Sequence, residues 1–195
     1  MSTKVLLCGV GGQGTILAAH VLAQTVLACG QKVKVSEIHG MAQRGGAVRT
    51  DVAFGDEVAS MVVDEGTADA VVAFELIEAL RNLPMLAAHG RMIASDEVIK
   101  PASVLTGKRP LPHDAAGTLQ DSGALIVPAH ATAVAAGNAK ASNMVLLGAL
   151  SALLALDEGA WEETVAAFVP PATVDANLGA FRAGRAFVIE KGAQA

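Results

Sequence analysis

The stretch KVLLCGVGGQG, residues 4–14, decides the fold, because a compact apolar run passes directly into a glycine-rich turn. Residues 4–10 predict a buried β-strand. Residues 13–29 predict a helix that is apolar on nearly all sides and therefore buried on more than one, and Gly30 suits its C-terminal end. A strand that opens into such a turn and helix is typical of α/β proteins, which hold their ligands at that edge of the sheet.

A second strand and a hairpin are predicted further along the chain. The alternation over residues 32–37 predicts a strand beside the first, so that the two form a βαβ unit with a right-handed crossover. Residues 47–54 and 58–63 flank the turn Gly55-Asp56-Glu57 and predict an inserted β-hairpin. The glycine-rich turn at residues 9–14 and a second one at residues 39–46 are then expected at the same edge of one sheet.

The remaining pattern alternates short apolar runs with helical segments. Strands are expected at residues 68–74, 91–95 and 125–127, and helices at 75–83, 129–136, 143–156, 161–168 and 174–191, with irregular structure over 99–112. The chain is therefore predicted to be a single α/β domain over residues 1–195. Its expected architecture is Rossmann-like: a three-layer, mostly parallel sheet with helices on both faces, a β-hairpin insertion and a C-terminal helical segment.

Composition limits the classes of function. Of the 195 residues, 52% are hydrophobic and 17% charged, and the formal net charge is −5, without a basic stripe that would suit nucleic acid. No signal peptide is evident, and the apolar stretch 144–156 is too short to cross a bilayer, so we expect a cytoplasmic protein that does not bind membranes. Cys8 and Cys29 are the only cysteines. We therefore expect no metal site and no iron–sulfur cluster held by this chain alone.

The first turn, residues 9–14, fits the pattern G-x-G-x-x-G between a strand and a helix. Such glycines permit a tight turn and close backbone approach, and the helix N-terminus favours an anion. Glu37 ends the second strand, near the place where dinucleotide-binding proteins carry a ribose-binding acid. This leaves two interpretations open, an NAD- or FAD-binding site and a turn that only lets the helix pack tightly. The candidate binding residues of this turn are Gly9, Gly11, Gly12, Gln13 and Gly14.

The second turn, SEIHGMAQRGGAV over residues 36–48, is not a dinucleotide motif. Arg44 offers a rigid fork of donors suited to a carboxylate or phosphate, or it forms a salt bridge with Glu37 or a partner chain. His39 could exchange a proton near neutral pH, or it is a loop histidine bonded to backbone. The candidate binding residues of this turn are Glu37, His39, Gln43, Arg44, Gly45 and Gly46.

Together, GVGGQG at residues 9–14 and EIHGMAQRGGAV at residues 37–48 resemble the γ-type domain of 2-oxoacid:ferredoxin oxidoreductases. The form HGMAQRGG is most similar to the small subunits of the indolepyruvate enzymes. Lys140 and Asn143, followed by Leu147-Gly148-Ala149, resemble a later segment of the same family. Residues 101–122 contain no motif that we match to this family.

The resemblance implies a subunit of a complex that decarboxylates an arylpyruvate oxidatively, with coenzyme A as co-substrate and ferredoxin as electron acceptor. It places thiamine diphosphate, Mg²⁺ and the iron–sulfur clusters in a larger partner subunit, with this chain bordering the active site and the coenzyme A entry path. Lys140 and Asn143 then point into that cleft, or they form only an ion pair and a helix cap. The rival interpretations are a stand-alone NAD(P)- or FAD-dependent oxidoreductase and a non-catalytic interaction module.

Overall fold

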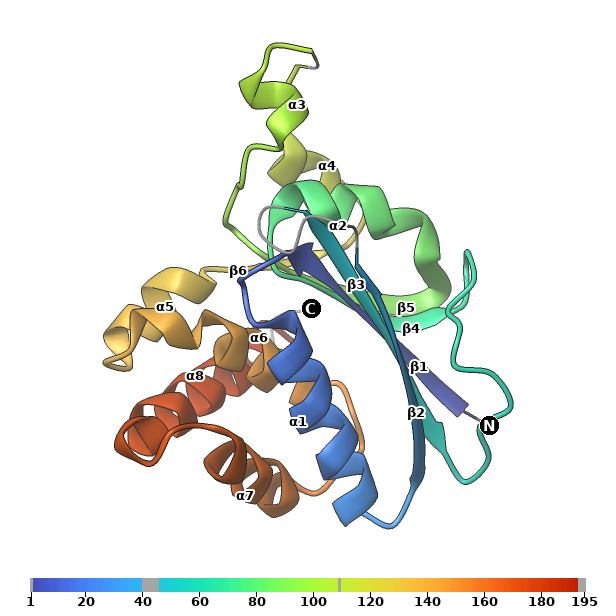
Figure 1. Ribbon diagram of the computed structural model, residues 1–195, viewed down its shortest axis with the longest axis vertical. Helices are drawn as coiled ribbons and strands as arrows, with labels where there is room; N and C mark the ends of the chain where they lie inside the picture. Colours follow the sequence, from blue (N-terminus) through green and yellow to red (C-terminus); the bar gives the residue numbers. More distant parts are fainter. Residues whose placement is uncertain (1, 40–45, 109, 193–195) are drawn as a thin grey trace.

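The computed structural model describes residues 2–39, 46–108 and 110–192, and these form a six-stranded sheet in the order β2-β3-β1-β4-β5-β6 (Figure 1). The strands are β1 (Ser2–Val10), β2 (Lys32–His39), β3 (Ala47–Gly55), β4 (Ala68–Ala73), β5 (Leu86–Ser95) and β6 (Leu125–Val127). Strands β1, β4, β5 and β6 pair in parallel, and β3 is antiparallel to both of its neighbours. The predicted mostly parallel sheet is therefore confirmed.

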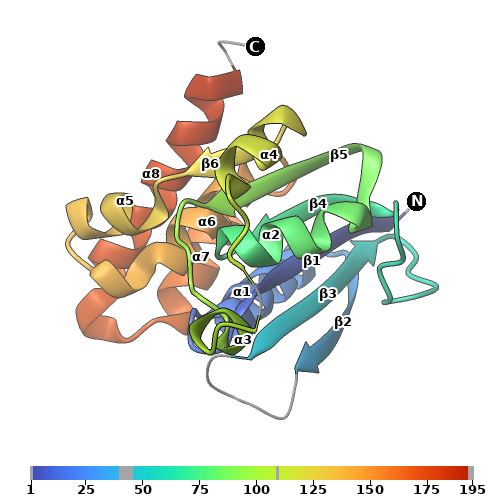
Figure 2. The same cartoon turned by 90° about the horizontal axis from the view of Figure 1, so that it is seen from above.

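Helices cover both faces of the sheet, as Figures 1 and 2 show. One face packs against α1 (Thr15–Ala28), α5 (Ala129–Ala135), α6 (Ser142–Ser151), α7 (Glu158–Phe168) and α8 (Val174–Gly192), and the other against α2 (Leu76–Asn82) and α4 (Ala115–Asp121). The chain also forms α3 (Ala102–Leu105) and the short 3₁₀ turns η1 (Leu83–Met85), η2 (Ala139–Ala141) and η3 (Pro171–Thr173). Alternation along β1 explains the layers, because Val5 and Leu7 enter the α1 core while Leu6 and Cys8 enter the α2 core.

The α1 face is held by close contact between α6 and α8. A Cβ atom at Gly148 would overlap the carbonyl oxygen of Phe181, and one at Gly184 would overlap that of Val145. The ring centroids of Phe181 and Trp161 lie 5.8 Å apart, and Trp161 is fully buried. The predicted C-terminal helical segment is therefore the main cover of this face. Among the described residues, no helix is both long and apolar enough to cross a membrane.

Two predictions about the N-terminal half are corrected. The strand over residues 32–37 is present, but β3 lies between it and β1, so β1 and β2 are not neighbours. An antiparallel hairpin also exists, but its strands are β2 and β3, and residues 58–63 form no strand. The local pattern could not reveal this arrangement because alternation identifies strands without identifying which strands pair.

Residues 56–66, which we name the strap, lie on the α2 side of the sheet instead of forming a strand. Side chains from β1, β2 and β3 bind its backbone: Lys4 Nζ donates to Val62 O (3.2 Å), Lys34 Nζ to Ala59 O (3.2 Å) and Arg49 Nη2 to Val63 O. The buried Asp51 carboxylate accepts from Val63 N (2.9 Å) and from Arg49 Nε (2.7 Å). These bonds satisfy four backbone groups of the strap without a sheet ladder.

Candidate functional site

An open cleft of about 330 Å³ lies at the carboxyl ends of β1, β4 and β5. Strand β1 leads into α1 on one face, while β4 leads into α2 on the other, so the connections diverge between these two adjacent strands. Open α/β sheets bind ligands at such a divergence. The polar lining consists of Gln13, Ser95, Glu97, His130, Lys140 and Ser142.

The first glycine turn forms one wall of this cleft. Gly12 (φ 106°) and Gly14 (φ 81°) have left-handed backbone conformations that favour glycine. Apart from its two chain neighbours, no heavy atom of the described residues lies within 4 Å of a Cβ built at Gly12, so these residues leave the backbone there open to a ligand. A Cβ at Gly14 would lie 2.6 Å from Asn143 Nδ2, which shows that Gly14 allows α1 and α6 to approach closely. The two glycines therefore serve different purposes, ligand access and packing.

Gln13 joins the ends of three strands. Its Oε1 accepts from Val10 N at the end of β1 (2.8 Å), and its Nε2 donates to Phe74 O after β4 (2.8 Å) and to Glu97 Oε2 after β5 (3.3 Å). Both amide hydrogens are thus used within the protein. A Cβ at Gly9 would lie 2.8 Å from Gln13 Oε1, so Gly9 makes room for this arrangement. Gln13 positions the cleft, and Gly9 supports it.

Opposite charges line the cleft without pairing. Glu97 follows β5, His130 lies on α5 and Lys140 on η2, and all three line the cleft. Within the part of the chain that the structure describes, no salt bridge within 4.0 Å joins any of them. The N-termini of α1 and α6 also lie here and add partial positive charge. The arrangement suits an anionic ligand that also offers a hydrogen-bond donor to Glu97.

The described residues that flank the second glycine turn lie at the same end of the sheet as the first turn. Gly11 N donates to Gly46 O (2.9 Å), and the last residue of β2, His39, pairs through its backbone with Val48. The predicted common edge is therefore confirmed for the described residues. Gln43, Arg44 and Gly45, together with the His39 side chain, lie outside the described residues.

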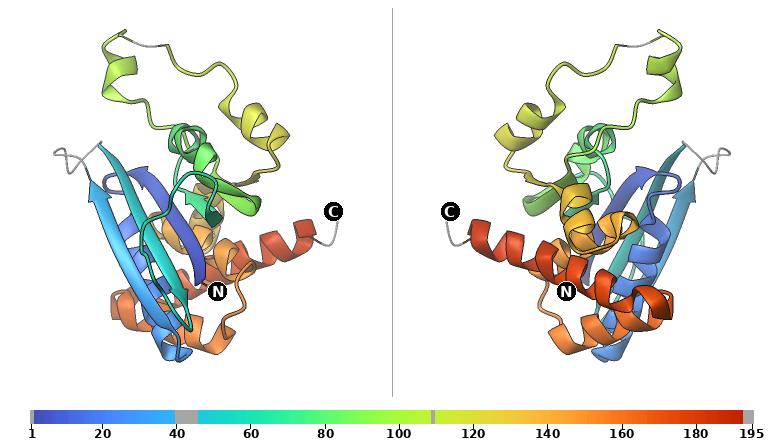
Figure 3. Two further views of the ribbon diagram at one scale, coloured as in Figure 1. Left: turned by 90° about the vertical axis from the view of Figure 1, so that its right-hand side faces the viewer. Right: turned by 90° about the vertical axis from the view of Figure 1, so that its left-hand side faces the viewer.

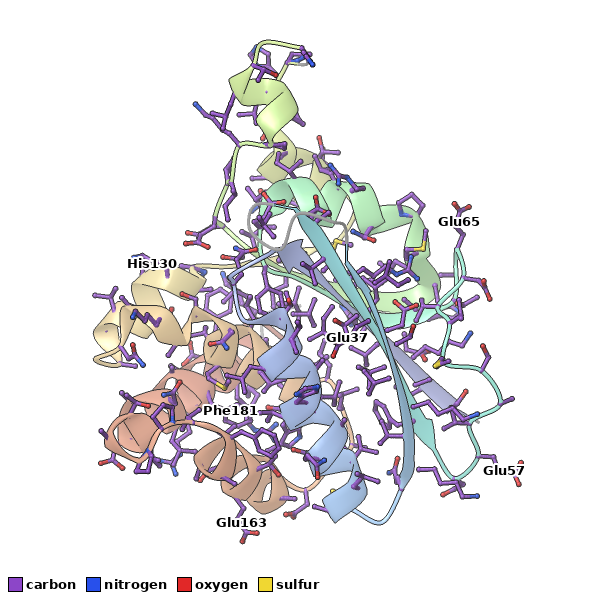
Figure 4. The ribbon with its side chains drawn as sticks, in the orientation of Figure 1. Glu37, Glu57, Glu65, His130, Glu163 and Phe181 are labelled. Carbon is purple, nitrogen blue, oxygen red and sulfur yellow. The ribbon has the colours of Figure 1, made fainter. Side chains whose placement is uncertain are left out.

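Glu37 does not line the cleft. Its Oε1 lies 3.4 Å from Nε2 of His20 on α1, and Figure 4 shows Glu37 well apart from His130. Because β3 separates β2 from β1, the end of β2 lies one strand farther from the first glycine turn than in the predicted βαβ unit. The arrangement therefore gives no support to Glu37 as a ribose-binding acid.

The structure separates the roles of Lys140 and Asn143. Lys140 is exposed and lines the cleft, whereas Asn143 is buried and lies against Gly14. Asn143 is not the N-cap of α6, because Ala141 occupies that position and the Asn143 Oδ1 accepts from Met144 N (3.0 Å). Lys140 is thus the better candidate for ligand contact.

Sequence reasoning missed four polar residues of the cleft: Ser95, Glu97, His130 and Ser142. Glu97 and His130 follow the carboxyl ends of β5 and β6 by two and three residues. The rule that ligands bind beyond such strand ends could have identified them. Cys8 remains a packing residue, since burial raises the pKa of its thiol and the sulfur lies 3.7 Å from Glu78 O.

The chain is similar to known proteins over nearly its whole length. Residues 4–187 match the family described as Pyruvate ferredoxin/flavodoxin oxidoreductase. The chain is 38% identical over 193 residues to indolepyruvate oxidoreductase subunit IorB from Thermococcus kodakarensis, covering 93% of each protein.

Solved structures show the same fold. The gamma subunit of a keto/oxoacid ferredoxin oxidoreductase from Geobacter sulfurreducens has a TM-score of 0.72 at 25% identity, with 96% of this chain and 99% of that chain covered. The 2-oxoglutarate:ferredoxin oxidoreductase from Magnetococcus marinus, solved with 2-oxoglutarate, coenzyme A and succinyl-CoA bound, has a TM-score of 0.72 at 20% identity. The match covers 97% of this chain and 31% of that one, and at this identity it shows the fold alone. The chain belongs to the pyruvate ferredoxin/flavodoxin oxidoreductase family, as a subunit of a 2-oxoacid oxidoreductase complex.

Proposed function

We propose that this chain is the small subunit of an arylpyruvate, most specifically indolepyruvate, ferredoxin oxidoreductase. The observation that carries the proposal is the open cleft at the carboxyl ends of β1, β4 and β5, whose charged groups form no salt bridge with any residue that the structure describes. The choice of indolepyruvate rests on the motif at residues 37–48 and on the similarity to the Thermococcus subunit. The chain acts in the cytoplasm as one domain within the complex.

The reaction converts the 2-oxoacid and coenzyme A into an acyl-CoA and carbon dioxide and transfers two electrons to ferredoxin. Thiamine diphosphate with Mg²⁺ would supply the carbanion chemistry and iron–sulfur clusters the electron path. The residues of this chain do not fit these groups. It has two cysteines, and no three His, Cys, Asp or Glu side chains among the described residues lie together as metal ligands. We therefore assign the cofactors to the larger partner subunit.

This chain's own contribution is to bind and orient an anion. Lys140 attracts a phosphate or carboxylate, and the open backbone at Gly12 permits its approach to the N-terminus of α1. Gln13 holds the ends of β1, β4 and β5 together through its hydrogen bonds, so that Glu97 faces the same cleft as Lys140. Coenzyme A is the preferred ligand, and the Magnetococcus enzyme was solved with it bound. Arg44, which lies outside the described residues, stays a candidate for a second anion contact on the grounds of its guanidinium chemistry alone.

The experiment is reconstitution with the larger subunit. We expect 2-oxoacid- and coenzyme A-dependent reduction of ferredoxin by the complex, with indolepyruvate preferred over pyruvate and 2-oxoglutarate, and no turnover by this chain alone. Tight binding of NAD(H) or a yellow flavin, with activity in isolation, would instead establish the stand-alone oxidoreductase. A larger subunit that is fully active without this chain would favour the interaction module.

A further inference from the structure

A second hollow lies at the opposite end of the sheet, where β5 and β6 begin. Two adjoining pockets of about 430 and 640 Å³ share Arg91 and Leu153 and so form one elongated groove. Residues at the end of α8 line it, and Figures 2 and 3 show that the last turns of this helix extend past the sheet. We name this the amino-end groove, and its residues used below are His89, Arg91, Leu153, Val188 and Lys191.

Arg91 differs from the other arginines that the structure describes. Each of those forms a salt bridge with a carboxylate: Arg49 with Asp51, Arg81 with Glu78, Arg182 with Glu162 and Arg185 with Glu158. Within the described residues, Arg91 has no carboxylate within 4.0 Å, and neither Lys191 nor His89 has one.

The groove is therefore basic in a chain of net charge −5. Its own acid, Asp69, already accepts a hydrogen bond from Lys4 N (2.7 Å). Charge complementarity thus calls for an anionic occupant that meets Arg91 where the two pockets join.

The shape of the groove and its apolar lining indicate that a protein segment binds there. The two joined pockets are open and elongated, and apolar side chains including Leu153, which is 37% exposed, line them. A second copy of this chain with its two-fold axis through the groove is a poor occupant, because Arg91 would then face its own copy across the axis. We propose that the amino-end groove receives an extended segment of the larger subunit, in which an acidic residue at Arg91 is flanked by apolar residues. This rests on the proposed function, since the larger subunit is the partner assigned there.

Affinity between the separately purified subunits tests the charge. Arg91→Glu is expected to raise the Kd by roughly 30-fold or more, because losing a buried charged partner at an interface has effects of that size. Lys191→Glu should have a smaller effect in the same direction, and Arg91→Lys should keep most of the affinity. The matched control is Lys100→Glu, the same charge change at an exposed residue beyond the other end of the sheet. Circular dichroism confirms that each variant is folded.

Photo-crosslinking tests the occupant. With p-benzoylphenylalanine in place of Leu153, the reconstituted complex should give a crosslink to an acidic segment of the larger subunit. Unchanged affinity of Arg91→Glu, or a crosslink only to a second copy of this chain, would overturn the groove proposal while an active complex leaves the proposed function standing. If the wild-type chain does not bind the larger subunit at all, the proposed function itself fails.

Discussion

The two faces of the sheet are stabilised in different ways. On the α1 face, helices α6 and α8 meet through glycines and the buried residues are apolar or uncharged. All of the buried carboxylates that the structure describes, Asp51, Glu75 and Glu78, lie on the α2 face. There they bind backbone groups of the strap, of α2 and of the loop after β5.

The difference shows where the cleft acquires its shape. Glu75 Oε2 accepts from Ile99 N (3.3 Å), and Glu97 O accepts from Leu76 N (2.8 Å), so the loop after β5 is bound to the start of α2. Gln13 extends the same network to β1. The α1 face thus provides a close-packed support, while the polar α2 face positions the loops that line the cleft.

Asp51→Ala should have the largest effect on stability. It removes the acceptor of Val63 N and leaves the partly buried Arg49 guanidinium without its carboxylate. We expect the free energy of unfolding to fall by about 3 kcal/mol. Urea denaturation measures it, with Asp56→Ala in the exposed start of the strap as the control. A loss no larger than that of the control would show that the strap is not held by Asp51.

Gly148→Ala tests the apolar face in the same way. The added methyl group overlaps the carbonyl oxygen of Phe181, so the free energy of unfolding should fall by about 2 kcal/mol despite the better helix propensity of alanine. Gly179→Ala on α8 is the matched control, because among the described residues outside its own helix a Cβ there would meet Ala136 alone, at an ordinary 3.7 Å. That control should be neutral or stabilising. Equal effects at both glycines would contradict the close α6–α8 contact.

Gln13→Leu tests the link between the two faces. The substitution leaves Val10 N and Phe74 O without their side-chain partner, so we expect a loss of about 1 kcal/mol in stability. In the reconstituted complex, the KM for coenzyme A should rise because Glu97 loses its position. Gln24→Leu, on the exposed side of α1, serves as the control. A variant with normal stability and normal kinetics would show that Gln13 does not position the cleft.

Glu78→Gln should have the smallest effect and should show it in the pH dependence. Burial raises the pKa of the Glu78 carboxyl, although the Arg81 guanidinium acts in the opposite direction. Glu78 therefore ionises more easily in the unfolded chain, and its ionisation reduces stability as the pH rises above its unfolded pKa of about 4.5. As the pH rises through this region, the free energy of unfolding should fall less for the variant than for the wild type. Urea unfolding at a series of pH values measures it. An unchanged pH profile would contradict the raised pKa.

Local sequence patterns predicted which helices and strands form better than they predicted which strands pair with each other. The apolar run 4–10, the turn at 9–14 and the helix that follows are present because each depends on residues close in sequence. The order of β2 and β3 depends on distant pairing, and the strap depends on Asp51, whose burial no local pattern reveals.

The candidate site was predicted in part for the same reason. Gly12 and Lys140 lie in motifs and were named from the sequence, whereas Glu97 and His130 belong to no motif and reach the cleft only through the sheet topology. Gln13 and Asn143 stay predicted ligand contacts, and the structure adds strand-linking hydrogen bonds for Gln13 and a packing contact with Gly14 for Asn143.

The most direct test of the account is the KM for coenzyme A of the reconstituted complex that carries Lys140→Ala. Removing the cation from the cleft should raise this KM about tenfold, while the KM for the 2-oxoacid changes little. Lys140→Arg should restore most of the affinity, and Lys100→Ala should have no effect. An unchanged KM for coenzyme A in Lys140→Ala would contradict the claim that this cleft binds the anionic co-substrate.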